Sequence, residues 1–478
     1  MSDRRAFVGT IAMGTVNAAR LGLQLLVLPI LARLLGPEAF GLIGLAMPFI
    51  LLTSMLADAG LGTALVRHPN PSIELESTVF WISTSIGVGL AIVLGLLSWP
   101  IAAIFSRPDL APVLVALSLI LALGGTMAVA NARIARSRNF SIFAIGDVLS
   151  TVLSATAGIS AALFGWGVWS LVLQQLVLWV TKAAWLFPIS NFRPQFVCRL
   201  KLARPYLHFG INSAAANLSD IIGKNLPPLV VGGTLGVTPL GHYSMAYQLT
   251  RVPDLIISGP IYLTTLTSVA RADRERAGPL VLRSLRIMVA ALAFLFCGLA
   301  LTADLATDVL LGPKWADTAP VLAALAPAGF LICVYSFIGA VLLGLGNSPR
   351  QLTLSVLSGL AIFIGASAGT QFEIVGVATG VSLGAAAMAP AYLWSLSREL
   401  RIPASLVVSN ILGSSAAAVA MVLTVLGVRL EIAHFPAMVQ LVVAMACGFA
   451  AYAIVLALTE GRKFVDDIRG LRPESQVV

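Results

Sequence analysis

The stretch that decides the fold runs from Leu110 to Ala132 and reads LAPVLVALSLILALGGTMAVANA. It contains no charged residue, and it exceeds the roughly 20 apolar residues that an α-helix needs to cross the hydrocarbon core of a membrane. Its apolar residues follow one another continuously, whereas those in a strand of a membrane β-barrel alternate with polar residues. The stretch therefore predicts a transmembrane α-helix.

Similar stretches fill the rest of the chain. Apolar residues occupy 58% of its 478 positions and charged residues only 11%, against about 25% charged residues in soluble proteins. No large soluble domain fits between the stretches. We predict an all-α polytopic membrane protein with about 14 transmembrane helices, which cover residues 7–32, 40–66, 79–104, 110–132, 141–163, 167–189, 205–232, 239–268, 282–306, 318–345, 351–370, 374–396, 404–428 and 435–458.

The first of these stretches follows directly after Met1-Ser-Asp-Arg-Arg5. It is too long for the core of a signal peptide, and no small-residue cleavage site precedes Arg20. We expect it to remain in the protein as the first span.

The 30 Lys and Arg residues are distributed unevenly among the predicted links. With a cytoplasmic N-terminus, 23 of them lie on the cytoplasmic side, four lie on the opposite side and three lie inside spans. This bias follows the positive-inside rule and predicts cytoplasmic N- and C-termini. The net charge of +9 is then explained by topology and implies no nucleic acid partner, although the basic residues from Arg193 to Arg204 leave a contact with anionic lipid headgroups open.

An internal repeat with an offset of 200 residues relates the first two spans to the seventh and eighth. Leu35-Gly36 and Gly41 align with Leu235-Gly236 and Gly241, while Asn17 aligns with Asn217. An even number of crossings separates the copies, so they run parallel, as in carriers built from two helical lobes. We predict four segments, which are a six-helix lobe (1–190), a basic cytoplasmic linker (191–204), a second six-helix lobe (205–400), and two additional helices with a tail (401–478).

Polar residues inside the predicted spans are the candidate functional residues. A charge near the bilayer centre costs about 2.5–3.5 kcal/mol on insertion scales, so such side chains tend to face a partner or a water-filled cavity. Those that would line a cavity between the lobes and attract an anionic group such as phosphate are Arg20, Lys224, Arg251, Asn17, Asn217 and Gln24.

Each of these cationic residues can also be explained by a purely structural role. Asp220 lies four residues before Lys224 on one helical face, and Asp254 lies three residues after Arg251, so neutralised structural pairs and snorkelling side chains would explain the same residues. Asp58 and Asp220 are candidates for binding a coupling cation. Asp58 fits a solvated helix end equally well.

Several chemistries lack their sequence signals. The four cysteines are scattered singly, so neither a metal site nor a disulfide framework is expected. There is no phosphate-binding GxxxxGK[ST] loop, no HExxH motif and no convincing Ser, His and Asp set. We therefore expect no cofactor and no enzymatic activity.

Taken together, the motifs resemble the Wzx-type polysaccharide flippases of the multidrug/oligosaccharidyl-lipid/polysaccharide (MOP) exporter superfamily. The resemblance extends over residues 5–400, and its two-lobe plan is MATE-like. The segments that carry it are Leu34–Leu42, Ser77–Trp81, Phe164–Leu176, Leu235–Tyr247, Ser268–Arg271 and Leu310–Trp315.

The resemblance implies a substrate. It would be an oligosaccharide repeat unit on a polyprenyl pyrophosphate, moved from the cytoplasmic to the periplasmic leaflet, with a polysaccharide polymerase and export machinery as further partners. One departure is that relatives commonly carry an Asp after the Asn-Leu of span 7, where this chain has Pro227 after Asn225-Leu226. Any role of that carboxylate is lost here.

Two rival functions remain. A cation-coupled multidrug exporter of the same superfamily would be expected to have more central carboxylates than cations, so Arg20 and Lys224 argue against it. A non-transporting scaffold of an envelope polysaccharide system would have similar helices, and a continuous hydrated cavity would count against that alternative.

Overall fold

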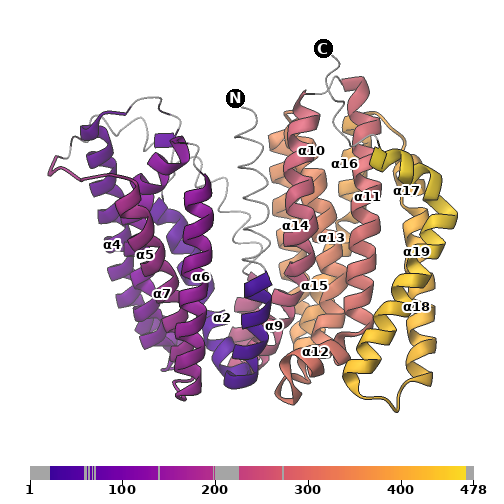
Figure 1. Cartoon of the computed structure of the whole chain (residues 1–478), viewed down its shortest axis with the longest axis horizontal. Helices are drawn as coiled ribbons and strands as arrows, with labels where there is room; N and C mark the ends of the chain where they lie inside the picture. Colours follow the sequence, from indigo (N-terminus) through magenta and orange to yellow (C-terminus); the bar gives the residue numbers. More distant parts are fainter. Residues whose placement is uncertain are drawn as a thin grey trace. The chain divides into compact units, whose positions relative to one another are not determined.

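Helices account for all the regular secondary structure of the described residues in the computed structural model, and no strand occurs among them (Figure 1). The structure describes residues 22–58, 62, 65–66, 68, 71–137, 140–197, 199, 226–271 and 274–469. The chain forms two compact units, residues 1–241 and 242–478. We describe each unit by itself.

The first unit contains five named helices and two shorter helical stretches, Gly22–Leu35 and residues 226–234. The helices are α2 (Pro37–Asp58), α4 (Ile73–Ile104), α5 (Leu110–Arg136), α6 (Phe140–Leu163) and α7 (Val168–Ile189).

Helix α9 (Val237–Pro253) starts in the first unit and continues into the second. The second unit then contains η1 (Asp254–Ser258), α10 (Gly259–Arg271), α11 (Arg274–Leu301), α12 (Ala303–Leu311), η2 (Pro313–Trp315), α13 (Thr318–Gly344), α14 (Ser348–Gly369), η3 (Thr370–Phe372), α15 (Glu373–Ala387), α16 (Ala389–Leu400), α17 (Ala404–Ser409), α18 (Leu412–Glu431) and α19 (Ala437–Arg469).

The two units share one packing pattern. In the first, α5 lies centrally and packs against α2, α4 and α7, while α6 pairs with α7. In the second, α13 packs against α10, α11 and α15, while α14 pairs with α15. The central helices are correspondingly buried, with Leu114 and Leu117 of α5 and Val341 and Leu342 of α13 all at 0% exposure. The equivalent helices follow one another in the same order, as expected of an internal repeat.

Ten segments of the described chain are long and apolar enough to cross a membrane. One of them, Ser348–Leu400, covers two of the predicted spans. Large apolar side chains are exposed on many helices, including Leu96 of α4, Leu423 of α18 and Leu458 of α19. Such surfaces suit the interior of a bilayer and not water, so the chain is a multi-pass membrane protein.

The predicted span 239–268 differs from expectation because it is interrupted. Helix α9 ends at Pro253, five residues of π-helix follow, and α10 begins at Gly259-Pro260. Proline has no N–H to donate, and its ring clashes with the carbonyl four residues earlier. Pro260 thus interferes with the carbonyl of Ile256, and the wider π-helical turn is a common way to absorb such a defect.

Within the first unit, equivalent segments of the two copies of the 200-residue repeat contact each other. Gly36 and Gly236 both have positive φ, 79° and 96°, and each ends one helix just before the next begins. A side chain on Gly41 would overlap the backbone carbonyl of Val237, and one on Gly241 would overlap that of Pro37. Since position 241 is 41 plus 200 and position 237 is 37 plus 200, the two contacts are the same contact made reciprocally. We call the contact formed by Pro37, Gly41, Val237 and Gly241 the glycine crossing.

Helices α14 and α15 also approach closely through glycine. Side chains on Gly365 and Gly380 would each overlap the other's backbone carbonyl. Small residues spaced by four are typical of tightly packed membrane helices, in which van der Waals packing drives association because lipid tails are as apolar as the helices.

Replacing Gly380 with alanine should therefore destabilise the protein by about 1–3 kcal/mol, the usual cost of overpacking. The measurement is the thermal unfolding midpoint of the purified protein in detergent. Gly95→Ala in α4 is the matched control, because no atom lies within 4 Å of the added methyl group and alanine is the better helix former. Equal midpoints for the two variants would contradict the close packing.

Candidate functional site

The residues predicted to bind substrate are only partly described. Gln24 lies in the helix Gly22–Leu35 of the first unit, and Arg251 lies in the last turn of α9, in the second unit; both side chains are exposed. Asp58 is the last residue of α2, and its side chain lies outside the described part. The remaining candidates lie outside the described residues, namely Arg20, Lys224, Asn17, Asn217 and Asp220. Their convergence on one cavity stays a prediction.

A buried ion cluster joins α4 and α5 of the first unit. The Glu76 carboxylate is 2% exposed and accepts hydrogen bonds from the Arg133 guanidinium, with Nε to Oε2 at 2.8 Å, and from Arg136 Nη2. Arg133 Nη1 also donates to the carbonyl of Asn191 at 2.9 Å, and its guanidinium lies 5.1 Å from the centre of the Phe192 ring. Both arginines were assigned by the sequence to topology alone.

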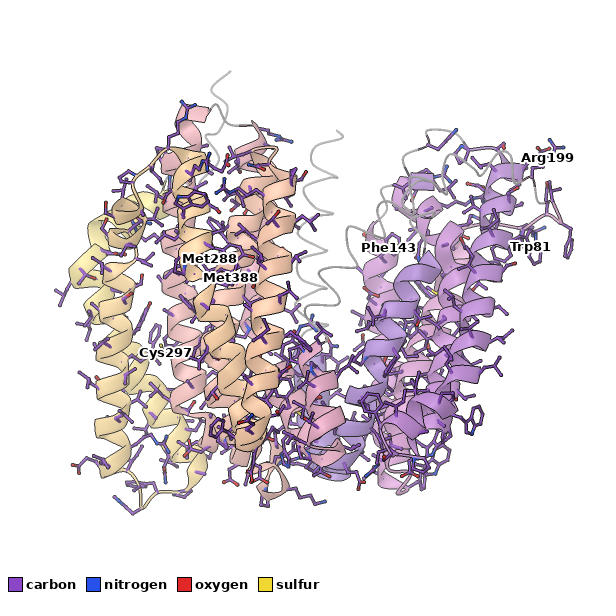
Figure 2. All side chains as sticks on the ribbon, turned by 180° about the vertical axis from the view of Figure 1, so that it is seen from behind. Trp81, Phe143, Arg199, Met288, Cys297 and Met388 are labelled. Atoms are coloured by element: carbon purple, nitrogen blue, oxygen red, sulfur yellow. The ribbon has the colours of Figure 1, made fainter. Side chains whose placement is uncertain are left out.

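The segment after α7 is held against the start of α4. The Ser77 hydroxyl accepts from the backbone N–H of Gln195 at 3.0 Å, and the Trp81 indole donates to the Gln195 carbonyl at 2.8 Å. Trp81 and Arg199 lie at the same end of the unit in Figure 2, where the Arg199 N–H donates to Thr78 Oγ1 at 3.1 Å. The motif Ser77–Trp81 therefore binds the beginning of the linker. The sequence signal for this role was the polar pair Ser77 and Thr78 at the start of an apolar span.

Two further motifs of the resemblance meet in the second unit. His242 of α9 is buried, and its Nδ1 lies 2.8 Å from Thr318 Oγ1. Its ring packs edge-on against Trp315, which is fully buried. The contact between His242 and Trp315 thus joins the motifs Leu235–Tyr247 and Leu310–Trp315, which gives these two residues a structural role.

A large apolar cluster forms the core of the second unit. Met288 of α11 is buried, and Met388, just before α16, packs against the same cluster. Both residues are labelled in Figure 2. Tyr335 of α13 stacks on Tyr392 of α16 at 4.0 Å, and its hydroxyl donates to the Ala385 carbonyl. These contacts fasten α13 to α15 and α16.

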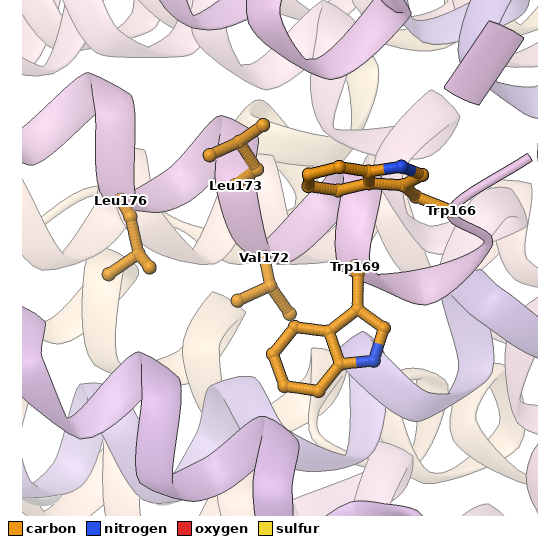
Figure 3. Close-up of a pocket in the computed structure, with 5 residues that line it drawn as sticks. All are labelled: Trp166, Trp169, Val172, Leu173 and Leu176. Carbon is orange, nitrogen blue, oxygen red and sulfur yellow. The ribbon is translucent and has the colours of Figure 1, made fainter. Parts of the chain in front are cut away.

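An apolar pocket of about 220 Å³ lies on α7 and the turn before it (Figure 3). Its lining residues are Trp166, Trp169, Val172, Leu173 and Leu176. The two tryptophans are 55% and 42% exposed, as is usual for side chains at a membrane interface. No charged group lines the pocket, so it is unsuited to a phosphate or sugar headgroup. Across the described residues, no group of three or more His, Cys, Asp or Glu side chains could hold a metal ion.

Known proteins resemble this chain in sequence and in fold. A family model described as polysaccharide biosynthesis protein matches residues 30–320. The succinoglycan biosynthesis transport protein ExoT of Rhizobium meliloti (strain 1021) is 28% identical over 470 residues, which cover 95% of this chain and 94% of that protein.

Solved structures share the fold at low sequence identity. The lipid II flippase MurJ in an inward closed conformation matches with a TM-score of 0.78 and 14% identity, covering 96% of this chain and 100% of that one. An inward-facing multidrug resistance MATE family transporter of the MOP superfamily matches with a TM-score of 0.64 and 16% identity, covering 82% and 98%. The all-helical fold class is confirmed by these likenesses.

Proposed function

The chain belongs to the polysaccharide biosynthesis protein family, and from this premise we propose that it flips polyprenyl-pyrophosphate-linked oligosaccharide repeat units from the cytoplasmic to the periplasmic leaflet. It is a membrane transporter of polysaccharide biosynthesis and not an enzyme, and its resemblance to Wzx-type flippases of the MOP superfamily is confirmed. The observation that carries the proposal is the similarity to the transport protein ExoT over 95% of the chain.

The chemistry of such a substrate sets what the protein must supply. A pyrophosphate and several sugars are too polar to enter the hydrocarbon core, where an unpaired charge is expensive. A hydrated cavity with cationic side chains would lower that barrier, while the polyprenyl tail stays in the lipid. We assign the cavity to Arg20, Lys224, Arg251, Asn17, Asn217 and Gln24, and alternating access to the two repeats.

The finer topology belongs to the same proposal. We place 14 spans in the inner membrane with both termini in the cytoplasm, two six-helix lobes at 1–190 and 205–400, and the linker 191–204 between them. Asp58 and Asp220 are the proposed sites for a coupling cation. A polysaccharide polymerase and export machinery would receive the flipped unit.

A complementation experiment tests the function and the site separately. The gene is deleted in its host and restored as wild type, Arg20→Ala, Lys224→Ala or Lys314→Ala; surface polysaccharide and lipid-linked repeat units are then measured. We expect deletion to stop export and to trap repeat units inside, and both site variants to fail although they insert normally. Lys314→Ala removes the same charge from an exposed link and should behave as wild type.

The outcomes separate the competing functions. If polymer export survives deletion, the flippase function is wrong and a multidrug exporter becomes the better hypothesis. If deletion blocks export but the Arg20 and Lys224 variants work, the function stands and the cationic site is wrong.

A further inference from the structure

An exposed tryptophan and two arginines gather at one end of the second unit. Trp394 of α16 is 57% exposed. The guanidinium carbon of Arg350, in the first turn of α14, lies 4.5 Å from the centre of the Trp394 ring, and that of Arg398 lies 5.3 Å from the same centre. Both distances are typical of cation–π contacts. Helix α14 begins and α16 ends here, so one ring collects positive charge from both ends of the apolar segment Ser348–Leu400.

The charge of Arg350 is balanced, whereas that of Arg398 is not. Arg350 pairs with Glu399, with Nη1 to Oε1 at 3.4 Å, and its Nε donates to Ser395 Oγ at 3.1 Å. The side chains of this pair are only 19% and 15% exposed, so the pair belongs to the packing of α14 on α16. Within the described part of the chain, no carboxylate lies at ion-pair distance from the exposed guanidinium group of Arg398.

A third arginine lies beside them in an unusual backbone conformation. Arg401 directly follows α16, is exposed, and has a φ of 55°, in the left-handed region that glycine usually occupies after a helix. This conformation is costly for a residue with a side chain. The Arg401 N–H donates to the Arg398 carbonyl at 3.4 Å, which closes the last turn. No carboxylate partner of Arg401 occurs among the described residues either, so two unbalanced positive charges lie at this helix end.

The helix that begins at these arginines carries a ridge of exposed apolar side chains. Its members lie four residues apart along α14 and are 40–64% exposed, namely Leu352, Val356, Leu360 and Ile364. Residues at this spacing lie above one another on one face of an α-helix. Such a ridge suits contact with acyl chains, and tryptophan is enriched at the boundary between headgroups and hydrocarbon. The ridge therefore lies at the depth of the acyl chains, and Trp394 with its arginines lies at the depth of the headgroups.

We propose that Arg350, Trp394, Arg398 and Arg401, which we call the Arg–Trp cluster, bind the phosphate group of an anionic phospholipid. Arg398 and Arg401 supply the unbalanced charge, and guanidinium N–H groups match phosphate oxygens in pairs. The Trp394 ring holds the Arg398 guanidinium in place, so less side-chain freedom is lost on binding.

The acyl chains of the bound lipid lie along the ridge of α14. A zwitterionic headgroup fits this place less well, because its ammonium group is repelled by the arginines. The proposal goes beyond the proposed function, since it gives the second unit a resident membrane lipid in addition to any lipid that the protein moves.

The direct test is native mass spectrometry of the full-length protein in detergent, titrated with phosphatidylglycerol or with phosphatidylcholine of the same acyl chains. We expect the first phosphatidylglycerol to bind more tightly than the first phosphatidylcholine. A basic residue near anionic lipid strengthens binding about fivefold. Arg398→Gln and Arg401→Asn should each weaken the first phosphatidylglycerol by about that factor, and the double variant by about 25-fold. Trp394→Leu keeps an apolar side chain without the ring and should weaken it as well.

Lys314→Gln is the matched control, because it removes one exposed positive charge far from the cluster. Lys314 lies just before α13, whereas Arg350 lies shortly after it. The 27 residues of α13 separate the two by roughly 40 Å. Phosphatidylglycerol should bind this variant as it binds the wild type. Equal affinity for Lys314→Gln and for the Arg398→Gln/Arg401→Asn double variant would overturn the proposal, as would equal affinity of the wild type for the two lipids.

Thermal unfolding in detergent gives a second measurement. A ligand that binds only the folded state raises the unfolding midpoint, so phosphatidylglycerol should raise the midpoint of the wild type more than phosphatidylcholine does. In the double variant the two lipids should act alike. A phosphatidylglycerol effect of the same size in both proteins would refute the site. Neither measurement requires transport, so both still decide the lipid site if deletion of the gene shows that the flippase function is wrong.

Discussion

Replacing Gly241 with valine is expected to leave little folded protein in the membrane. The side chain would overlap the backbone carbonyl of Pro37 in α2, and a backbone atom cannot rotate away as the end of a flexible side chain can. We expect a loss of about 3 kcal/mol, the upper end of the usual range for overpacking. Size-exclusion chromatography of the detergent-solubilised protein, heated in steps, measures the fraction that remains monodisperse.

Because the contacts in the glycine crossing are reciprocal, we also expect the effects of substitutions at Gly41 and Gly241 to be coupled. Gly41→Val forces the same two helix starts apart at the carbonyl of Val237. Once one valine has separated them, the other adds little, so the double variant should lose clearly less stability than the sum of the two single losses. Gly427→Val in α18 is the control, since no atom from outside its own turn of helix lies within 4 Å of a Cβ added there. Strictly additive losses would show that the two contacts are independent.

The repeat whose two copies meet at this crossing was visible in the sequence, because glycine recurs at the positions where the backbone needs it. Gly36 and Gly236 adopt positive φ, which other residues rarely do, and Gly41 and Gly241 permit contact with a carbonyl. What the sequence did not provide was the partner. An offset of 200 residues aligns the two copies, but it does not say that they touch.

The all-helical fold was predictable for a different reason. In a bilayer, a chain must satisfy its own backbone hydrogen bonds, so long apolar stretches have few structural options. The interruption at Asp254 was not predicted, because Pro253 and Pro260 are also compatible with a bent but continuous helix.

The ion cluster at Glu76 was also missed, for a physical reason. Charges near span ends are common, and the positive-inside rule accounts for Arg133 and Arg136 without any partner. Their pairing with Glu76 depends on how α4 and α5 pack, and a count of charges per link contains no such information. For the candidate substrate site, Gln24 and Arg251 are exposed, and the meeting of all six candidates in one cavity stays a prediction.

Replacing Glu76 with glutamine is the second change with a large expected effect. The substitution keeps the shape of the side chain and removes the only negative charge that Arg133 and Arg136 share in the described structure. Removing one partner of a buried ion pair usually costs about 3–5 kcal/mol, because the remaining charge is left without compensation. Two arginines would then repel each other, and we expect a loss in that range in the free energy of unfolding.

The loss should spread to the linker, since Arg133 binds the carbonyls of Ser190 and Asn191. Limited trypsin digestion of the folded protein should therefore cleave Glu76→Gln faster after Arg199, whose backbone is held by Thr78. Glu38→Gln is the control, because Glu38 is 61% exposed and pairs with Arg107 at the surface, where an ion pair contributes at most about 1 kcal/mol. Equal digestion of the two variants would mean that the linker is held by Ser77, Thr78 and Trp81 alone, and that the buried charges stabilise only the packing of α4 on α5.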